Sequence, residues 1–497
     1  MAHRWMRHAA IASACLVAAW SGAWAQSGIP SPAQPDQVPR RFETPVQPRA
    51  TDKPVMDDQR QRSGAPPGAE TVRFVMQGLS IDGVTIYTAD DLAPLFRPLL
   101  GKEISLLQLY DLADAITAKY ANDGYILSVA LVPAQRIAEG RARLQVIEGY
   151  VDRVLFDGPG APHATALVRA MGAKIARARP LDSETLERYL LLLGDLPGIT
   201  ARGVLRPSDM PGASDLVIVL DRKPMDAVAS FDNRGTRFVG PFQASFGASF
   251  NDTLGFNEQT NVRAIAATQW NELRSIGIAH DTSIGLEGTR GQISFQKSYV
   301  EPQFTLRDLR IESEQSSIGA GLSHPLIRSR GENLTLRSRF DIRNSRVEQD
   351  RGVTTLSEDR IRALRLGASY DRLDAELGLP GVSLFSAELS QGLNVLGARE
   401  TGSATLSRTS GRSQFTKGTL EAQRVQTLGD GFAVLLSASA QYSFSNLLAS
   451  EEFFFGGAQY GRGFDPGEIS GDHGVATKVE LQWGQTGRSG AVRDFQL

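Results

Sequence analysis

The second half of the sequence consists largely of long segments in which apolar and polar residues alternate with a period of two. Three clear examples are 242–251, 334–343 and 432–445. A period of two places one set of side chains on each face of a β-sheet. At about ten residues, these segments exceed the usual strand of a globular protein and match a tilted membrane crossing. The pattern therefore predicts a sheet with one apolar and one polar face.

Two folds fit that pattern, a soluble β-sandwich and a transmembrane β-barrel. A sandwich turns its apolar faces to a core, whereas a barrel turns its apolar face to lipid and its polar face to a wet lumen. The polar face of 334–343 carries three arginines, and no segment approaches the roughly 20 apolar residues of a membrane-spanning helix. About twelve candidate strands lie between Met225 and Leu497. These features favour an antiparallel transmembrane β-barrel over residues 225–497.

The N-terminus has the features of a secretory signal peptide. Arg4 and Arg7 precede a short apolar run at 9–19, and the small-x-small site Ala23-Trp24-Ala25 follows. A signal peptidase cuts after such a site, which predicts residues 1–25 as the signal peptide. The next segment, 26–70, is rich in proline and polar residues and has almost no periodic apolar positions. Its composition predicts a disordered or extended periplasmic linker.

The region from Thr71 to Lys223 contains a repeat of roughly 75 residues. Each copy opens with an apolar strand that ends in Asp-Gly, at Asp82-Gly83 and at Asp157-Gly158. Each copy continues with apolar residues at helical spacing and closes with two strands. The order strand-helix-helix-strand-strand predicts two α+β modules, at 71–149 and 150–223, each with helices on one face of a sheet.

Composition and motifs give no sign of catalysis or of a bound cofactor. The net charge is −2, so no basic excess indicates nucleic acid. The six histidines are scattered without metal-ligand spacing, and neither a phosphate-binding loop nor a Gly-x-Ser-x-Gly nucleophile elbow occurs. The single cysteine, Cys15, lies in the predicted signal peptide, so a mature chain would hold no disulfide. We therefore expect no enzyme and no cofactor or metal.

One loop near the end of the sequence differs from the others in its density of glycine. It follows the eleventh candidate strand and contains the runs Phe455-Gly456-Gly457, Tyr460-Gly461-Arg462-Gly463-Phe464 and Ser470-Gly471-Asp472. Dense glycine around one arginine indicates a loop that is folded tightly and pressed against other backbone. The alternative is a flexible extracellular loop with a chance arginine.

The first two of these runs resemble the Arg-Gly-Phe signature in the sixth extracellular loop of two-partner secretion (type Vb, TpsB class) transporters. Those transporters are the haemolysin secretion/activation proteins of the outer-membrane assembly superfamily. The two repeats are similar to that family's paired POTRA modules, and the resemblance covers roughly residues 71–497. The family usually has valine or a similar residue where this chain has Gly461.

The resemblance implies a barrel of sixteen strands whose motif loop folds back into the lumen. Arg462 would contact the inner barrel wall and help to set a conducting conformation. Gly461, Gly463 and Phe464 would shape the loop tip. The remaining loop-shaping residues would be Gly456, Gly457, Gly471 and Asp472. Many family members also carry an N-terminal helix that plugs the pore, and the proline-rich segment leaves open whether this chain has one.

The resemblance also implies a function in the cell outer membrane, with the POTRA modules in the periplasm. An unfolded exported partner, a large β-helical haemolysin or adhesin, would pair an extended segment with a POTRA sheet edge or helix groove. It would then thread the lumen to the cell surface without cofactor or nucleotide. Other partners would be outer-membrane lipid and, during insertion, the barrel-assembly machinery. A barrel-assembly factor of the same superfamily and a passive porin remain alternatives, although two modules favour secretion.

About twelve strands are fewer than the sixteen that the resemblance implies. An open edge in lipid leaves backbone groups unsatisfied at several kcal/mol each. We therefore expect the chain to be incomplete at its C-terminus, with its first and last strands unpaired. The aromatic-x-Asp wall motif that receives the loop arginine in the family would then lie beyond Leu497. The alternative is a smaller closed barrel of twelve strands.

Overall fold

The structure, a computed structural model, describes residues 47–50, 56–57, 64–210, 212–350, 352–486 and 494–496. The predicted signal peptide and most of the predicted linker lie outside these residues. The chain divides into two compact units. One unit comprises Lys53–Lys223 with Gly255–Asn257, and the other comprises Met1–Asp52, Pro224–Leu254 and Glu258–Leu497.

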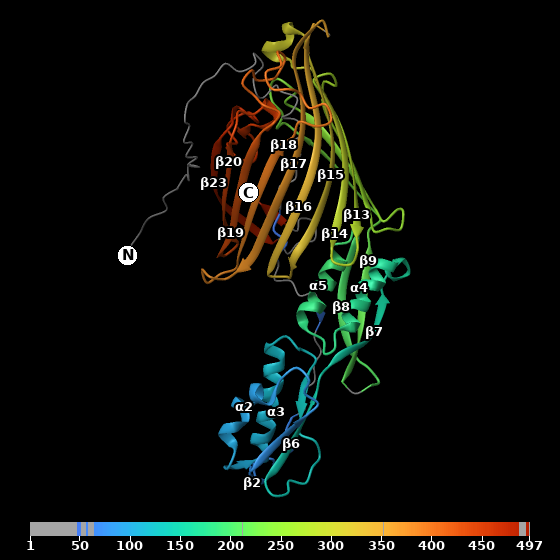
Figure 1. Cartoon of the computed structure of the whole chain (residues 1–497), viewed down its shortest axis with the longest axis vertical. Coiled ribbons are helices and arrows are strands. Elements are labelled where there is room, and N and C mark those ends of the chain that lie inside the picture. Colours follow the sequence, from blue (N-terminus) through green and yellow to red (C-terminus); the bar gives the residue numbers. More distant parts are fainter. Residues whose placement is uncertain are drawn as a thin grey trace, which may run out of the picture. The chain divides into compact units, whose positions relative to one another are not determined.

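The first module of the smaller unit has the expected order strand-helix-helix-strand-strand (Figure 1). Its elements are β3 (Gly78–Asp82), α2 (Ala89–Phe96), α3 (Leu106–Asn122), β5 (Val129–Leu131) and β6 (Arg141–Ile147). In the sheet β3-β6-β5, the first two strands are parallel and the last two antiparallel. Helix α3 begins at a capping box in which Ser105 and Gln108 exchange hydrogen bonds. A short ribbon of β2 (Arg73–Val75) and β4 (Glu103–Ser105) was not predicted.

The second module repeats this order and gains one strand. Its elements are β7 (Tyr150–Asp157), α4 (Ala166–Arg177), α5 (Ser183–Gly194), β8 (Ile199–Pro207) and β9 (Ala213–Arg222). The sheet order is β1-β8-β9-β7, and β1 (Met56–Asp57) comes from the predicted linker. It pairs in parallel with β8, Met56 opposite Gly203 and Asp57 opposite Val204. Part of the predicted linker is therefore a strand.

The Asp-Gly signature marks equivalent positions in the two modules. Gly83 and Gly158 have φ angles of +83° and +86°, which side chains rarely adopt. A Cβ at Gly83 would lie 2.2 Å from the carbonyl oxygen of Val146, and one at Gly158 would lie 2.6 Å from that of Leu220. Both glycines let the turn after the first strand approach the last strand. The module boundaries at 71–149 and 150–223 stay predictions.

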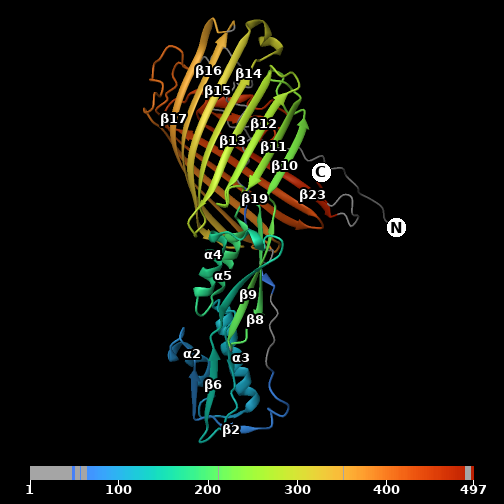
Figure 2. The same cartoon turned by 90° about the vertical axis from the view of Figure 1, so that its right-hand side faces the viewer.

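The larger unit is built on one antiparallel sheet in which successive strands pair (Figure 2). Its strands are β10 (Met225–Asp232), β11 (Gln243–Asn251), β12 (Gln259–Ala267), β13 (Leu273–Ile284), β14 (Thr289–Val300), β15 (Ile311–Arg328), β16 (Glu332–Gln349), β17 (Thr354–Asp374), β18 (Gly381–Gly392), β19 (Thr416–Gly429), β20 (Phe432–Ser443), β23 (Gly474–Thr486) and β24 (Asp494–Gln496). The predicted fold class, α+β modules followed by a barrel-type antiparallel sheet, is confirmed. Strands β15, β16 and β17 have 18, 18 and 21 residues, more than expected. A crossing uses about ten residues, so these strands extend beyond it.

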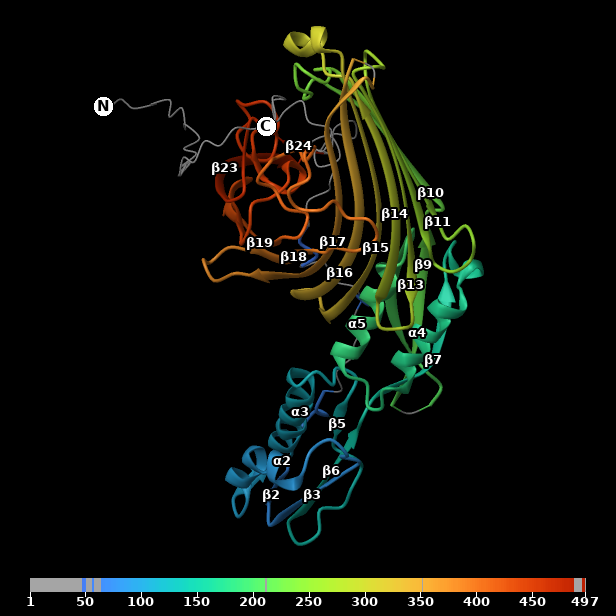
Figure 3. The same ribbon diagram turned by 45° about the horizontal axis from the view of Figure 1, so that its top comes forward.

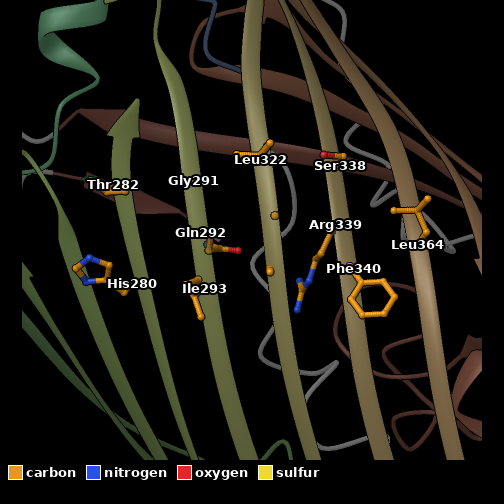
Figure 4. Close-up of a pocket in the computed structure, with 12 residues that line it drawn as sticks. His280, Thr282, Gly291, Gln292, Ile293, Leu322, Ser338, Arg339, Phe340 and Leu364 are labelled. Carbon is orange, nitrogen blue, oxygen red and sulfur yellow. The ribbon is translucent and has the colours of Figure 1, made fainter. Parts of the chain in front are cut away.

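The sheet is curved (Figure 3). Its two faces differ as the alternation predicts. One face, called the outer face here, exposes large apolar side chains such as Phe246, Phe385 and Leu436. A shallow apolar depression on it, between β13 and β17, is lined by residues that include Ile293 and Phe340 (Figure 4). The opposite, inner face carries the polar set, including the predicted arginines of β16. Such a sheet suits lipid on one side and water on the other.

The edges of the sheet remain apart. Strand β10 pairs with β11, β24 pairs with β23, and no ladder among the described residues joins β10 to β23 or β24. The first and last strands are thus unpaired with each other, as expected, and the alternative of a closed twelve-stranded barrel does not describe this sheet. Incompleteness of the chain stays a prediction. Within the described part of the chain, no helix combines the length and apolar character needed to span a membrane.

Candidate functional site: the motif loop

The glycine-rich loop between β20 and β23 forms a hairpin. Its stem is the antiparallel pair β21 (Phe453–Phe455) and β22 (Ile469–Gly471). We call residues 456–468 the loop tip, and residues 449–452 with 472–473 the loop base. The tip carries the motif residues, and the base joins the hairpin to the wall.

Three glycines of the tip are required by its backbone. Gly456, Gly457 and Gly461 have φ angles of +115°, +96° and +80°. A Cβ at Gly456 would lie 2.2 Å from the carbonyl oxygen of Asp465, and one at Gly461 would lie 2.8 Å from the ring of Phe455. The departure at Gly461 from the valine usual in the family therefore has a physical reason, because a branched side chain fits neither the φ angle nor the space.

The remaining tip residues behave differently from one another. The amide of Phe464 donates to the carbonyl of Gly461 at 3.0 Å, and its ring packs on Phe455 with centroids 5.8 Å apart. A Cβ added at Gly463 would have no other atom within 4 Å, and the φ angle of Gly463 is not positive. Gly463 thus has no steric constraint, whereas Gly461 and Phe464 make close contacts within the tip. The shaping roles of these residues stay predictions.

Arg462 contacts the inner wall, as the resemblance implies. Its Nη2 lies 2.6 Å from Oε1 of Glu480, on β23, and Nζ of Lys478 lies 3.4 Å from the same oxygen. The side chain of Arg462 is 69% exposed. Alternation turns Glu480 inward, so the twelfth strand supplies this carboxylate. The expected aromatic-x-Asp motif falls outside the described residues and stays a prediction.

Two further contacts hold the tip to separated parts of the sheet. The hydroxyls of Tyr460 and Ser437, on β20, share a hydrogen bond of 2.8 Å. Nε of Arg237, in the loop between β10 and β11, donates to Oδ2 of Asp465 at 3.0 Å. The tip is thus bound to β20 and β23 and also to the first hairpin of the sheet.

The loop base is anchored by a buried carboxylate, Glu451. Its side chain is fully buried, and its Oε1 lies 2.7 Å from Nη2 of Arg365 and 3.5 Å from Nη1 of Arg343. Its Oε2 lies 2.8 Å from Nζ of Lys417. Three cations from β16, β17 and β19 therefore surround one anion. No sequence pattern indicated this cluster, since Glu451 belongs to a loop.

The base is also tied to the loop at 393–415. Oδ1 of Asp472 accepts from the amide of Leu447 at 3.0 Å and from Nη1 of Arg408. Arg408 also lies 3.1 Å from Glu452. Leu406 and Phe415 pack with Leu447 and Leu448 in a buried cluster against β17. Asp472 thus lies in the base. Gly471 lies close to His473, because a Cβ added at Gly471 would lie 3.3 Å from the carbonyl oxygen of His473.

A second candidate site is the edge of the first module's sheet at β5. Strand β5 pairs with β6 on one side, and no other described strand pairs with it. The equivalent strand of the second module, β8, is already paired with β1. An edge without a partner strand offers main-chain groups to an extended peptide, but the amide of Ala130, in β5, already donates to Oγ1 of Thr117, on α3, at 2.9 Å.

Glu148 closes the first module just after β6. It accepts from the amides of Thr85 and Ile86 at 2.8 and 3.1 Å and from the hydroxyl of Tyr120 at 2.8 Å. Burial alone raises the pKa of Glu148, but these hydrogen bonds outweigh it and hold the pKa below its ordinary value. Burial and the bond to Glu148 raise the pKa of Tyr120.

Comparison with protein families matches both regions of the chain. Residues 212–494 match the family described as "Haemolysin secretion/activation protein ShlB/FhaC/HecB". Residues 74–149 match the family "POTRA domain, ShlB-type". The first match covers more than half of the chain.

Curated relatives and solved structures point the same way. The chain is similar to the heme/hemopexin transporter protein HuxB of Haemophilus influenzae (strain 86-028NP), with 24% identity over 79% of this chain and 69% of the relative. It is similar to the outer membrane transporter CdiB of Escherichia coli O6:K15:H31, with 23% identity over 84% of this chain and 70% of the relative. The solved structure of CdiB from Escherichia coli has a TM-score of 0.69 at 22% identity, over 86% of this chain and 79% of that chain. CdiB from Acinetobacter baumannii has a TM-score of 0.57 at 14% identity, over 91% and 83%.

Proposed function

We propose that this chain, which belongs to the haemolysin secretion/activation family of outer-membrane transporters, carries an unfolded exported partner protein to the cell surface. The modules recognise the partner in the periplasm, and the polar inner face of the sheet conducts it. The observation that carries the proposal is the motif loop, whose Arg462 reaches from the tip to Glu480 on the wall at 2.6 Å.

Recognition of the partner is assigned to a sheet edge or helix groove of the modules, and the edge of β5 is one candidate. Main-chain pairing there would accept an extended segment with limited demand on its sequence. An unfolded partner presents such segments, whereas a folded one does not. We further propose that the partner is a large β-helical haemolysin or adhesin, and that the barrel-assembly machinery inserts the sheet.

The role proposed for the loop tip follows from the strength of its contacts. Exposed ion pairs contribute about 0–1 kcal/mol, so the pair of Arg462 and Glu480 can open without a large cost. Arg462 and its neighbours Gly461, Gly463 and Phe464 would thereby set a conducting conformation. A passive porin has no use for the two modules, and a barrel-assembly factor is disfavoured by the family match over 212–494.

The test is a secretion assay in cells that supply the partner. Arg462→Ala should reduce export sharply while the protein remains in the outer membrane. Arg424→Ala is a matched control, because Arg424 lies 2.8 Å from Asp374 but has no contact with the loop. Deleting residues 72–149 should abolish export without preventing insertion. Unchanged export in Arg462→Ala would mean that the loop arginine has no role in transport.

A further inference from the structure

A short segment ahead of the modules, residues 47–50, lies against the inner face of the sheet. The amides of Arg49 and Ala50 both donate to Oδ2 of Asp371, on β17, at 3.0 and 2.7 Å. In Figures 1 and 3 this segment is the short blue trace within the curve of the sheet. Two successive main-chain N–H groups thus share one carboxylate oxygen.

The carboxylate of Asp371 is held in place by the wall. Nδ2 of Asn333, on β16, donates to the same oxygen at 3.0 Å, and Nη1 of Arg328 donates to Oδ1 of Asn333 at 2.9 Å. Asp371 and Asn333 are 4% and 1% exposed. A buried carboxylate needs donors, and here the wall supplies one while the passing segment supplies two.

The two hydrogen bonds to Asp371 use main-chain donors. Any two successive residues other than proline carry the same N–H groups, so these two bonds require no particular side chain. Pro48, directly before Arg49, has no N–H group and biases the preceding residue toward extended backbone. Recognition that ignores side chains suits a transporter of unfolded chains.

The position of Asp371 along the sheet places it near one end. Asp371 is close to the last residue of β17, and Asn333 is close to the first residue of β16. In an antiparallel sheet of successive strands, β10 begins at this same end, at Met225. The modules directly precede β10 in the chain, so this is the end at which an exported chain would enter.

We propose that Asp371 forms, with Asn333, a binding site for the main chain of an extended polypeptide at the entrance of the barrel. Residues 47–50 occupy the site at rest, and the exported chain displaces them. The displacing chain is identified through the proposed function, whereas the site itself rests on the hydrogen bonds of 3.0 and 2.7 Å. The pairing of β1 with β8 is a second contact of the same N-terminal segment through main chain.

The binding test uses a labelled synthetic peptide with the sequence of residues 44–53 and the full chain in detergent. Replacing Arg49 and Ala50 by proline removes both main-chain donors, so it should vacate the site and raise peptide affinity about tenfold or more. On that background, Asp371→Ala should lower the affinity about tenfold, and Asp371→Asn should retain much of it, since an amide oxygen still accepts. The matched control is Asp281→Ala, which removes an inner-face carboxylate bound by Gln292 at 3.0 Å.

A modified peptide tests main-chain reading without altering the protein. One methyl group on the nitrogen of Ala50 removes a donor and should lower affinity about tenfold, whereas one on Gln47 should not. Binding that is insensitive to Asp371→Ala, or to the methyl group at Ala50, would overturn the site. These measurements need no exported partner, so they stand if the proposed function fails.

The displacement step is tested by secretion. Asp371→Ala should lower export severalfold relative to Asp281→Ala, with both variants present in the outer membrane. Normal export by Asp371→Ala together with intact peptide binding in the parent would overturn displacement. Absence of export in the unaltered chain would instead contradict the proposed function.

Discussion

The base and the tip of the motif loop use the same type of contact at very different strengths. At the base, the buried Glu451 is surrounded by three cations. At the tip, Arg462 and Arg237 are 69% and 57% exposed in their ion pairs. Breaking a buried ion pair costs about 3–5 kcal/mol, whereas an exposed pair contributes about 0–1 kcal/mol. Movement of the loop is therefore expected beyond Phe453, with the base fixed.

The largest effect is expected from Glu451→Ala. Removing the carboxylate leaves Arg365 and Lys417 buried with a lost partner, which should destabilise the sheet by about 3–5 kcal/mol. Urea unfolding in detergent, followed by the loss of the heat-modifiable band, measures the change. The control is Glu314→Ala, because Glu314 lies 2.8 Å from Lys297 in a more exposed ion pair on the outer face. Equal urea-unfolding midpoints for the two variants would mean that the buried ion pairs stabilise the sheet no more than an exposed pair does. The distinction between base and tip would then be lost.

The next effect concerns the backbone of the tip. Gly461→Val restores the usual family residue but forces a branched side chain to a φ angle of +80°. Strain of about 1–3 kcal/mol should displace the tip. Disulfide formation between Arg462→Cys and Glu480→Cys reports the tip position and should fall in this background. Gly463→Val should leave it unchanged, since Gly463 has open space around a built Cβ.

A pH test asks whether the hydrogen-bonded carboxylate of Glu148, outside the membrane, stabilises its module as strongly as the contacts of the loop base or as weakly as those of the loop tip. The pKa of Glu148 is lowered in the folded module, so its stabilisation is present above the unfolded pKa of about 4.3. That stabilisation is lost as the pH falls through the lower folded pKa. Glu148→Gln should cost about 1 kcal/mol at pH 7 and flatten the acid limb. Hydrogen exchange of α3 in the full chain measures both, and an unaltered acid limb would contradict the assignment.

The smallest effect is expected from Arg237→Ala. The pair with Asp465 is exposed, so its loss should cost less than about 1 kcal/mol and leave insertion unaffected. Raised salt should loosen the tip in the unaltered chain and change the Arg237→Ala variant less. Limited proteolysis at the tip, at low and high salt, compares them. A tip that salt loosens as much in Arg237→Ala as in the unaltered chain would argue against an exposed, releasable tip.

The alternation of residues was enough to predict much of the sheet and part of the site. Parity along β16 turns Arg337 inward, and the same rule places Glu480 where Arg462 reaches it. The motif indicated Arg462 directly. Glu451 could not be predicted, because its partners lie on three strands far apart in sequence. The strand β1 was missed for a related reason, since a two-residue strand depends on the edge that receives it rather than on its own pattern.

Because β1 pairs with the edge of β8, any other extended chain must compete with β1 for that edge. A strand that belongs to the same chain as its binding edge acts at an effective concentration on the order of millimolar. A free polypeptide that binds β8 weakly would lose to this internal competitor, however abundant other unfolded chains in the periplasm become. Only a chain already held elsewhere on the protein gains a comparable local concentration. The edge at β8 is therefore closed to weakly binding free chains while β1 occupies it.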